Sequence, residues 1–233
     1  MVRWRRTPRK LKISRSLTLL LLFAIAFGLS LSNAIADGDL TTNNESRLTL
    51  DCAQDRVWDT DIGDGFRKHA YHLGLNAGGG FGLKIFGGRS DHDIALGNLE
   101  FGAMLSGPVA KDHFWRGNFE FIGEVFGGEQ FNHHTAYVVG FAPLMRYDFA
   151  TGSRLVPFFG GGVGPTLTDI RHPDLSTDFE FNVQVGAGVH WFFQPKLAAT
   201  LEGRWLHLSN GGFDHPNQGA NTSMVLVGVN WFF

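Results

Sequence analysis

The stretch 179-FEFNVQVGAGVHWFF-193 decides the fold. Its even-numbered positions are polar or small, with Phe192 as the one exception. Its odd-numbered positions are apolar throughout: Phe179, Phe181, Val183, Val185, Ala187, Val189, Trp191 and Phe193. Successive side chains of a β-strand point to opposite faces, so this period of two predicts a strand with one apolar and one polar face.

The same alternation recurs along the chain, while long helical periodicity is absent after residue 36. Seven further segments carry it with varying strength: 69–77, 92–105, 116–126, 136–149, 155–164, 196–209 and 221–233. Together with the first stretch they predict eight strands and an all-β protein.

Two features of these strands favour a lipid environment. The apolar faces end in pairs of aromatic residues, as the interfacial girdles of membrane barrels do: Trp191 and Phe193, Tyr147 and Phe149, Trp231 and Phe233. The polar faces combine glycine, alanine and charges of both signs, which suits a narrow lumen filled by side chains. We therefore expect an eight-stranded antiparallel transmembrane β-barrel of the outer-membrane type over residues 67–233. A secreted or periplasmic β-barrel is the alternative, because alternation alone is a weak signal.

The N-terminal region has the pattern of a secretory signal. Residues 1–16 carry seven Lys and Arg and no acid, residues 17–31 are nearly all apolar, and Ala34-Ile35-Ala36 is a small-x-small cleavage pattern. This predicts a signal peptide over residues 1–36, with an uncleaved anchor as the alternative. Residues 37–66 are polar without alternation, and we expect them to lie outside the barrel. Cys52 is the one cysteine, so no internal disulfide is expected.

Charge and the C-terminal residue bear on partners. Removing residues 1–36 leaves 13 basic and 22 acidic residues, a formal charge of −9, which gives no electrostatic footprint for nucleic acid. The chain stops on Phe233 at the end of a predicted strand. In this it resembles bacterial outer-membrane barrels, and the resemblance implies recognition of Phe233 by the barrel assembly machinery.

The stretch 205-WLHLSNGGFDHPNQGAN-221 holds the candidate site. In residues 196–209 the even positions include Lys196, Glu202 and Arg204, so the odd positions, which include His207 and Ser209, face lipid. Counting back in twos from Phe233 reaches Asn221, which places all three polar residues on one outer face. With both termini periplasmic, the turn between these strands is extracellular. His207, Ser209 and Asn221 are therefore expected at the interface of the outer leaflet.

These three residue types suit ester hydrolysis. Unpaired polar groups that face hydrocarbon are costly, so their presence there suggests a chemical role. A neutral imidazole accepts a proton from a serine hydroxyl, a third polar group fixes the imidazole tautomer, and N–H groups of a glycine-rich turn bind an oxyanion. In the alternative interpretation Ser209 only begins the turn and His207 is an interfacial polar residue.

The stretch resembles the lipid A 3-O-deacylase (PagL) family. The residues that carry the resemblance are His207, Ser209, Asn210, Gly212, Pro216, Asn217 and Gly219. The resemblance implies an outer-membrane barrel that hydrolyses the 3-O-acyl ester of lipid A in lipopolysaccharide without a cofactor. It implies that His207 is the general base and Ser209 the nucleophile, and that Asn210 and Gly212 shape the oxyanion hole.

The sequence departs from the family pattern at position 221, where the family has Glu and this chain has Asn. Asn221 can accept the imidazole N–H but cannot stabilise an imidazolium by charge, so a carboxylate there is expected to retain or raise activity. Outer-membrane phospholipase A is similar in using Ser, His and Asn, which keeps phospholipid as an alternative substrate. A structural or adhesive barrel without catalysis is the third possibility. Asp214 is a possible substitute acid, whereas Glu202 faces the lumen.

Other polar and glycine-rich motifs are interpreted as structural. His133-His134 and Asp91-His92-Asp93 fit loop polarity better than a metal site, because adjacent strand residues point to opposite faces. The glycine runs at 78–82 and 160–164 lack the context of a phosphate-binding loop and are expected to help a small barrel bend and pack. No metal or cofactor is predicted.

Overall fold

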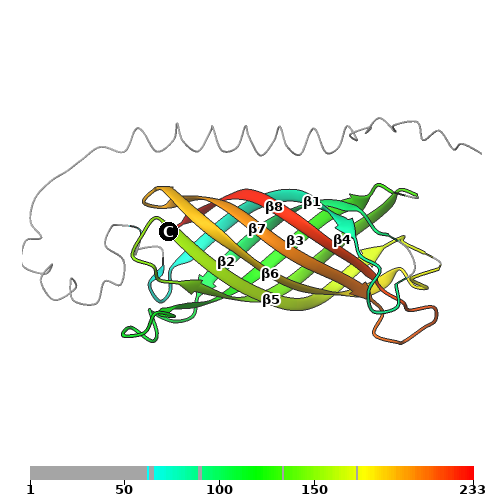
Figure 1. The fold of residues 1–233 in the computed structure, drawn as a ribbon, viewed down its shortest axis with the longest axis horizontal. Coiled ribbons are helices and arrows are strands. Elements are labelled where there is room, and N and C mark those ends of the chain that lie inside the picture. Colours follow the sequence, from blue (N-terminus) through cyan, green and yellow to red (C-terminus); the bar gives the residue numbers. More distant parts are fainter. Residues whose placement is uncertain (1–61, 63–65, 89–90, 133, 172) are drawn as a thin grey trace, which may run out of the picture. The chain divides into compact units, whose positions relative to one another are not determined.

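The computed structural model describes residues 62, 66–88, 91–132, 134–171 and 173–233. Eight strands follow one another and form a closed antiparallel barrel (Figure 1). Their bounds are β1 Tyr71–Gly82, β2 Ile94–Met104, β3 Gly117–Gln130, β4 Ala136–Phe149, β5 Leu155–Thr168, β6 Phe179–Gln194, β7 Leu197–Ser209 and β8 Ala220–Phe232. The prediction of an eight-stranded β-barrel is confirmed.

Pairing between the first and last strands closes the barrel. His72 of β1 pairs with Phe232 of β8, and the antiparallel register continues without a break to Gly82 and Thr222. Every neighbouring pair is antiparallel, so backbone groups are satisfied around the whole ring and no strand edge is left open. No helix among the described residues is long and apolar enough to cross a membrane.

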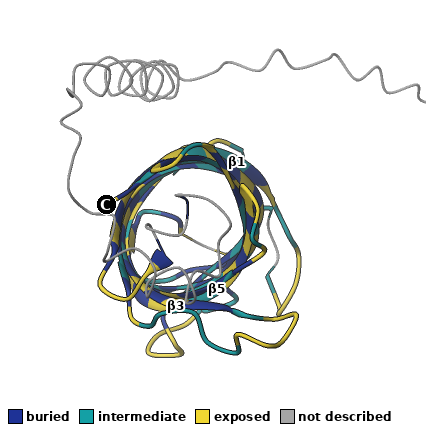
Figure 2. Ribbon diagram, turned by 90° about the vertical axis from the view of Figure 1, so that its left-hand side faces the viewer, coloured by how far each residue is buried: buried dark blue, intermediate teal, exposed yellow. Residues whose placement is uncertain are grey.

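The two faces of the strands differ as the alternation predicts, and buried and exposed residues alternate around the ring (Figure 2). The outer face carries apolar side chains that are half exposed or more, such as Leu99, Val125 and Val185. The inner face carries buried charged and amide groups that bond to one another. The outer face is therefore apolar over the length of the strands, as contact with lipid requires.

The barrel has two distinct ends. We call the end that bears the β1–β2, β3–β4, β5–β6 and β7–β8 connections the loop end, and the opposite end the terminal end. At the terminal end Phe66 is fully buried and its ring contacts Phe192 and Phe232. Ile62 is buried in the same cluster. These two residues of the 37–66 segment therefore pack against the barrel. The predicted signal peptide, residues 1–36, lies outside the described residues.

Strands β1 and β5 both end later than their alternation predicts: β1 continues through its glycine run to Gly82, and β5 continues beyond its glycine run to Thr168. A Cβ atom at Gly78 would overlap the carbonyl oxygen of Val225 on β8, and one at Gly162 would overlap the carbonyl oxygen of Pro143 on β4. The glycines thus permit close approach of neighbouring backbones, a role that a run without side chains conceals from an analysis of apolar periodicity.

Candidate active site at the loop end

His207 and Asn221 meet on the outer face of the barrel. They are direct cross-strand partners on β7 and β8, which puts their side chains side by side. The Nδ1 atom of His207 lies 2.9 Å from Oδ1 of Asn221, within hydrogen-bond distance. With Nδ1–H donating to this oxygen, the free lone pair of the imidazole is on Nε2, the atom that a general base would use.

Ser209 lies two residues beyond His207 on β7, in the same outward row. Its backbone pairs with Phe181 on β6, and its side chain is partly exposed. The Ser209 hydroxyl makes no hydrogen bond to any residue that the structure describes, His207 included. The structure therefore joins His207 to Asn221 directly and leaves the Ser209 hydroxyl free on the same face.

Asn221 is covered by the β1–β2 connection, a feature that the sequence analysis missed. Its side-chain Nδ2 atom donates to the backbone carbonyl oxygen of Ile85 at 3.2 Å, and the backbone carbonyl oxygen of Asn221 accepts from the N–H of Leu83 at 2.8 Å. Asn221 is only 1% exposed as a result, although the alternation puts it on the outward row. The position is thus a buried contact between β8 and a loop and not a lipid-facing one.

Aromatic rings and a glycine surround the His207 imidazole. Trp205 stacks on it with ring centroids 5.7 Å apart and an interplanar angle of 21°. Phe86 of the β1–β2 connection meets it edge-on at 6.5 Å. Gly219 lies against the ring, since a Cβ atom there would be 2.5 Å from Cε1 of His207. The imidazole therefore has little freedom to rotate away from Asn221.

Asn210 organises the β7–β8 turn through its side chain. Its Oδ1 accepts from the N–H of Gly212 at 2.9 Å, and its Nδ2 donates to the carbonyl of Asp214 at 3.0 Å and to the hydroxyl of Ser176 at 3.1 Å. The N–H of Asn210 donates to Oδ1 of Asn217 at 3.1 Å. Asn210 and Gly212 therefore shape the turn, and the N–H of Gly212 is already bonded in this state.

Two other donors of the turn are free within the described part of the chain. The backbone N–H of Gly211 and the side-chain amide nitrogen of Asn217 donate no hydrogen bond there. Gly211 lies beside the ring of Phe181, the cross-strand partner of Ser209. Gly211 is two residues and Asn217 eight residues beyond Ser209, both in the β7–β8 turn.

The other acids weighed as partners of His207 do not reach it. Asp214 accepts a hydrogen bond from the N–H of His215 at 2.8 Å. Glu202 lies in the lumen, where its Oε1 accepts from Nε of Arg204 at 2.7 Å. Among the described residues no group of three or more His, Cys, Asp or Glu side chains is arranged to hold a metal ion.

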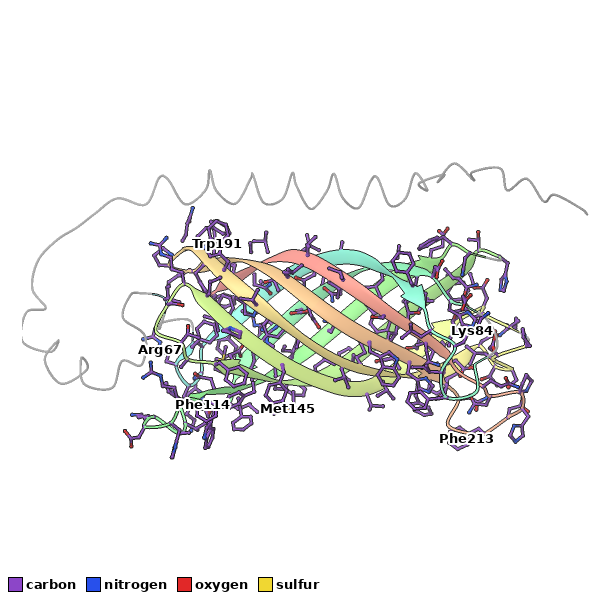
Figure 3. All side chains as sticks on the ribbon, viewed as in Figure 1. Arg67, Lys84, Phe114, Met145, Trp191 and Phe213 are labelled. Atoms are coloured by element: carbon purple, nitrogen blue, oxygen red, sulfur yellow. The ribbon has the colours of Figure 1, made fainter. Side chains whose placement is uncertain are left out.

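Exposed aromatic side chains flank the site. Phe86 is 74% exposed on one side, and Phe213 of the β7–β8 turn is 82% exposed on the other and contacts Phe181. Figure 3 shows Lys84 and Phe213 at the same end of the barrel, opposite Arg67 and Phe114. Apolar rings from two loops thus contact residues near Ser209, with Phe86 against His207 and Phe213 against Phe181.

The sequence model of the lipid A 3-O-deacylase (PagL) family matches residues 99–230, which is more than half of the chain and includes His207, Ser209 and Asn221. The chain belongs to this family. The PagL family is one of hydrolases, and a match of this extent includes the turn from Asn210 to Gly219 together with both strands that flank it.

Solved structures show the same fold as this PagL-family chain at low sequence identity. The crystal structure of the outer membrane enzyme PagL has a TM-score of 0.53 and 17% identity, and covers 66% of this chain and 97% of that one. Neisserial surface protein A has a TM-score of 0.51 and 14% identity, and covers 71% of this chain and 100% of that one. At these identities the likeness concerns the barrel alone. A search of curated proteins found no match.

Proposed function

We propose that this protein is an outer-membrane serine esterase that removes the 3-O-acyl chain of lipid A. Ser209 is the nucleophile, His207 the general base and Asn221 the group that orients the imidazole. The observation that supports this assignment is the 2.9 Å His207–Asn221 hydrogen bond, next to a serine hydroxyl that has no partner among the described residues. The pair thus combines an imidazole whose Nε2 has no partner in the described part of the chain with a nearby serine hydroxyl, which is the combination that nucleophilic ester hydrolysis uses.

In the proposed reaction Nε2 of His207 takes the proton of the Ser209 hydroxyl while Oγ attacks the ester carbonyl carbon. The carbonyl π electrons move to the oxygen, and the resulting oxyanion accepts hydrogen bonds from the turn, where the N–H of Gly211 and the side-chain nitrogen of Asn217 have no partner among the described residues. The imidazolium then protonates the departing sugar oxygen. The same imidazole then deprotonates a water molecule, which attacks the acyl-enzyme carbonyl. The bond between the acyl carbon and Oγ of Ser209 breaks, Oγ takes the proton back from the imidazolium, and the fatty acid is released.

The roles assigned to Asn210 and Gly212 follow from their contacts. Their mutual hydrogen bond holds the turn that carries the free donors, so they support the oxyanion hole by shaping it. For the N–H of Gly212 to donate to an oxyanion directly, its bond to Asn210 would first have to open. Substrate binding at the turn would drive that exchange.

The setting of the site follows from the fold. We propose that the signal peptide over residues 1–36 is removed, that Phe233 is recognised by the barrel assembly machinery, and that the loop end is extracellular. The Ser209 row then meets the outer leaflet, where lipopolysaccharide is the abundant lipid. The apolar flanks formed by Phe86 and Phe213 suit an acyl chain better than a polar substrate.

Mass spectrometry of lipid A and phospholipids from a Gram-negative host tests the proposal. Cells that express the protein should lose one 3-linked acyl chain from lipid A, and cells that express Ser209→Ala should not. Lysophospholipid in place of deacylated lipid A would assign the protein as a phospholipase A, an alternative that the neutral Asn221 keeps open. No change in either lipid class would indicate a barrel without catalysis.

A further inference from the structure

The β1–β2 connection makes a tight turn directly over the candidate site. The N–H of Gly88 donates to the carbonyl oxygen of Ile85 at 3.1 Å, which closes a four-residue turn. Its two central residues both have positive φ, 54° at Phe86 and 91° at Gly87, as in a type I′ turn. Glycine adopts such a conformation readily, but phenylalanine does so rarely. A Phe at this position is a local conflict between sequence and backbone, and such conflicts concentrate at functional sites.

The turn directs two groups at the site. The Phe86 ring reaches Trp205 at 5.9 Å and His207 at 6.5 Å. The Ile85 carbonyl oxygen accepts a second hydrogen bond, from Nδ2 of Asn221 at 3.2 Å. The unfavourable conformation of Phe86 is therefore accompanied by contacts to both members of the His207–Asn221 pair.

The Ile85 carbonyl decides which way the Asn221 amide faces. A backbone carbonyl accepts hydrogen bonds and never donates them, so the Asn221 atom that bonds to it must be the NH₂ group. The other amide atom, Oδ1, then faces His207 as an acceptor only. An acceptor there requires the N–H at Nδ1 of His207, which leaves the lone pair on Nε2.

We propose that the Ile85 carbonyl is a positioning group of this enzyme, which fixes the Asn221 amide and through it the His207 tautomer. The residue at 221 and the loop form one unit, in which Asn221 both donates to Ile85 and accepts from His207. A carboxylate at 221 has no proton to donate, and would set an anionic oxygen against the carbonyl oxygen. The sequence-based expectation that Asp at 221 retains or raises activity is therefore reversed for a chain that has this loop.

The tautomer part of this inference stands on contacts alone, and its catalytic part rests on the proposed function. The inference is tested by weakening one hydrogen-bond acceptor, the Ile85 carbonyl. Replacing Phe86 with phenyllactic acid converts the Ile85–Phe86 peptide into an ester, whose carbonyl is a poorer acceptor. The N–H that this removes makes no hydrogen bond in the described part of the chain.

Phe114 at the terminal end offers a matched control. It is 98% exposed, and the carbonyl of His113 before it also closes a turn, by accepting from the N–H of Arg116 at 3.1 Å. The same ester at Phe114 weakens an equivalent turn far from the site. Heat-dependent gel mobility checks that both ester proteins form folded barrels.

Nitrogen NMR of histidine-labelled protein in detergent reads the tautomer without any substrate, with His207→Gln used to assign the signals. We expect protonated Nδ1 and free Nε2 in the unmodified protein and in the Phe114 ester, and a mixture of both tautomers in the Phe86 ester. A Phe86 ester whose His207 signals match those of the unmodified protein would overturn the inference.

Activity provides the second measurement. The Phe86 ester should lower kcat for deacylation of lipid A roughly three- to tenfold with little change in KM, as expected for one weakened hydrogen bond. Asn221→Asp should be slower than the unmodified protein, and its deficit should shrink in the Phe86 ester. Equal or higher activity of Asn221→Asp in the native loop would contradict the proposal. If no form hydrolyses lipid, the proposed function fails, while the NMR result still decides the tautomer.

Discussion

Arg204 in the lumen and Ser209 on the outer row of the loop end are both polar side chains next to apolar ones, but they differ in their hydrogen bonds. Arg204 in the lumen makes four hydrogen bonds, to Glu202, Glu124 and Gln184. Ser209 on the outer row makes none within the described part of the chain. A group with all its partners stabilises one arrangement, whereas a group left without a partner beside an oriented imidazole is available for substrate. If the proposed function is correct, Arg204 belongs to the residues that hold the barrel and Ser209 to those that take part in the reaction.

The largest effect should come from the unpaired group. Ser209→Ala removes the nucleophile and should lower kcat by roughly 10³-fold or more, with the thermal stability of the barrel unchanged. Release of fatty acid from lipid A by the purified protein in detergent measures it. Ser223→Ala is the control, because Ser223 is an exposed hydroxyl on the outer face of the neighbouring β8. An equal loss of activity in both variants would mean that hydrolysis depends on the lipid-facing surface in general and not on Ser209.

The lumen should show the converse behaviour. Arg204→Met leaves the buried carboxylates of Glu124 and Glu202 without their cation, which should destabilise the barrel by about 3–5 kcal/mol. Denaturant unfolding followed by gel mobility measures the loss. Activity per folded molecule should stay within about twofold, because Arg204 points away from the outer row. A variant that keeps full stability but loses hydrolysis would erase the distinction between the two regions.

A smaller loss is expected from the residue that orients the base. Asn221→Ala removes the acceptor at Nδ1 of His207 and should reduce kcat by roughly 10²-fold, less than Ser209→Ala, since the third member of such a unit matters less than nucleophile or base. Asp214→Ala is the matched test, because Asp214 bonds to the N–H of His215 and not to His207. We expect it to retain activity. The reverse result would transfer the orienting role to the turn.

The same contrast explains how much the sequence could predict. Alternation gives the strands and the lumen-facing side of Glu202 and Arg204, because the period of two follows from strand geometry alone. It also puts His207, Ser209 and Asn221 in one row. It cannot show that Ile85 covers Asn221, because the two are 136 residues apart and no period links a loop to a strand.

The conformation of the loops was also beyond sequence reasoning. Gly87 and Gly88 mark a turn, but rules that expect Gly, Asn or Asp at a positive φ do not predict that Phe86 adopts one as well. The bond between Asn210 and Gly212 depends on the turn geometry as a whole. The site residues that the sequence could predict belong to a repeating pattern or a family motif. Those it missed are fixed by a single contact.

Gly219 offers the smallest and most local test of the comparison. Its φ of 77° disfavours any side chain, and a Cβ atom would lie 2.5 Å from Cε1 of His207. Gly219→Ala should therefore turn the imidazole away from Asn221 and lower kcat roughly tenfold with KM nearly unchanged, because a small misplacement of a catalytic group is costly.

Gly152→Ala is the control, since Gly152 has a φ of 72° in the β4–β5 turn at the terminal end. Both variants carry the backbone strain of a left-handed alanine, and so both should lose a similar stability of about 1 kcal/mol. Only Gly219→Ala should lose activity, since only there does the added methyl group meet the imidazole. If the two variants hydrolyse lipid A equally well, the position of the His207 ring does not limit the reaction, and the outer row would differ from the lumen in its bonding but not in its function.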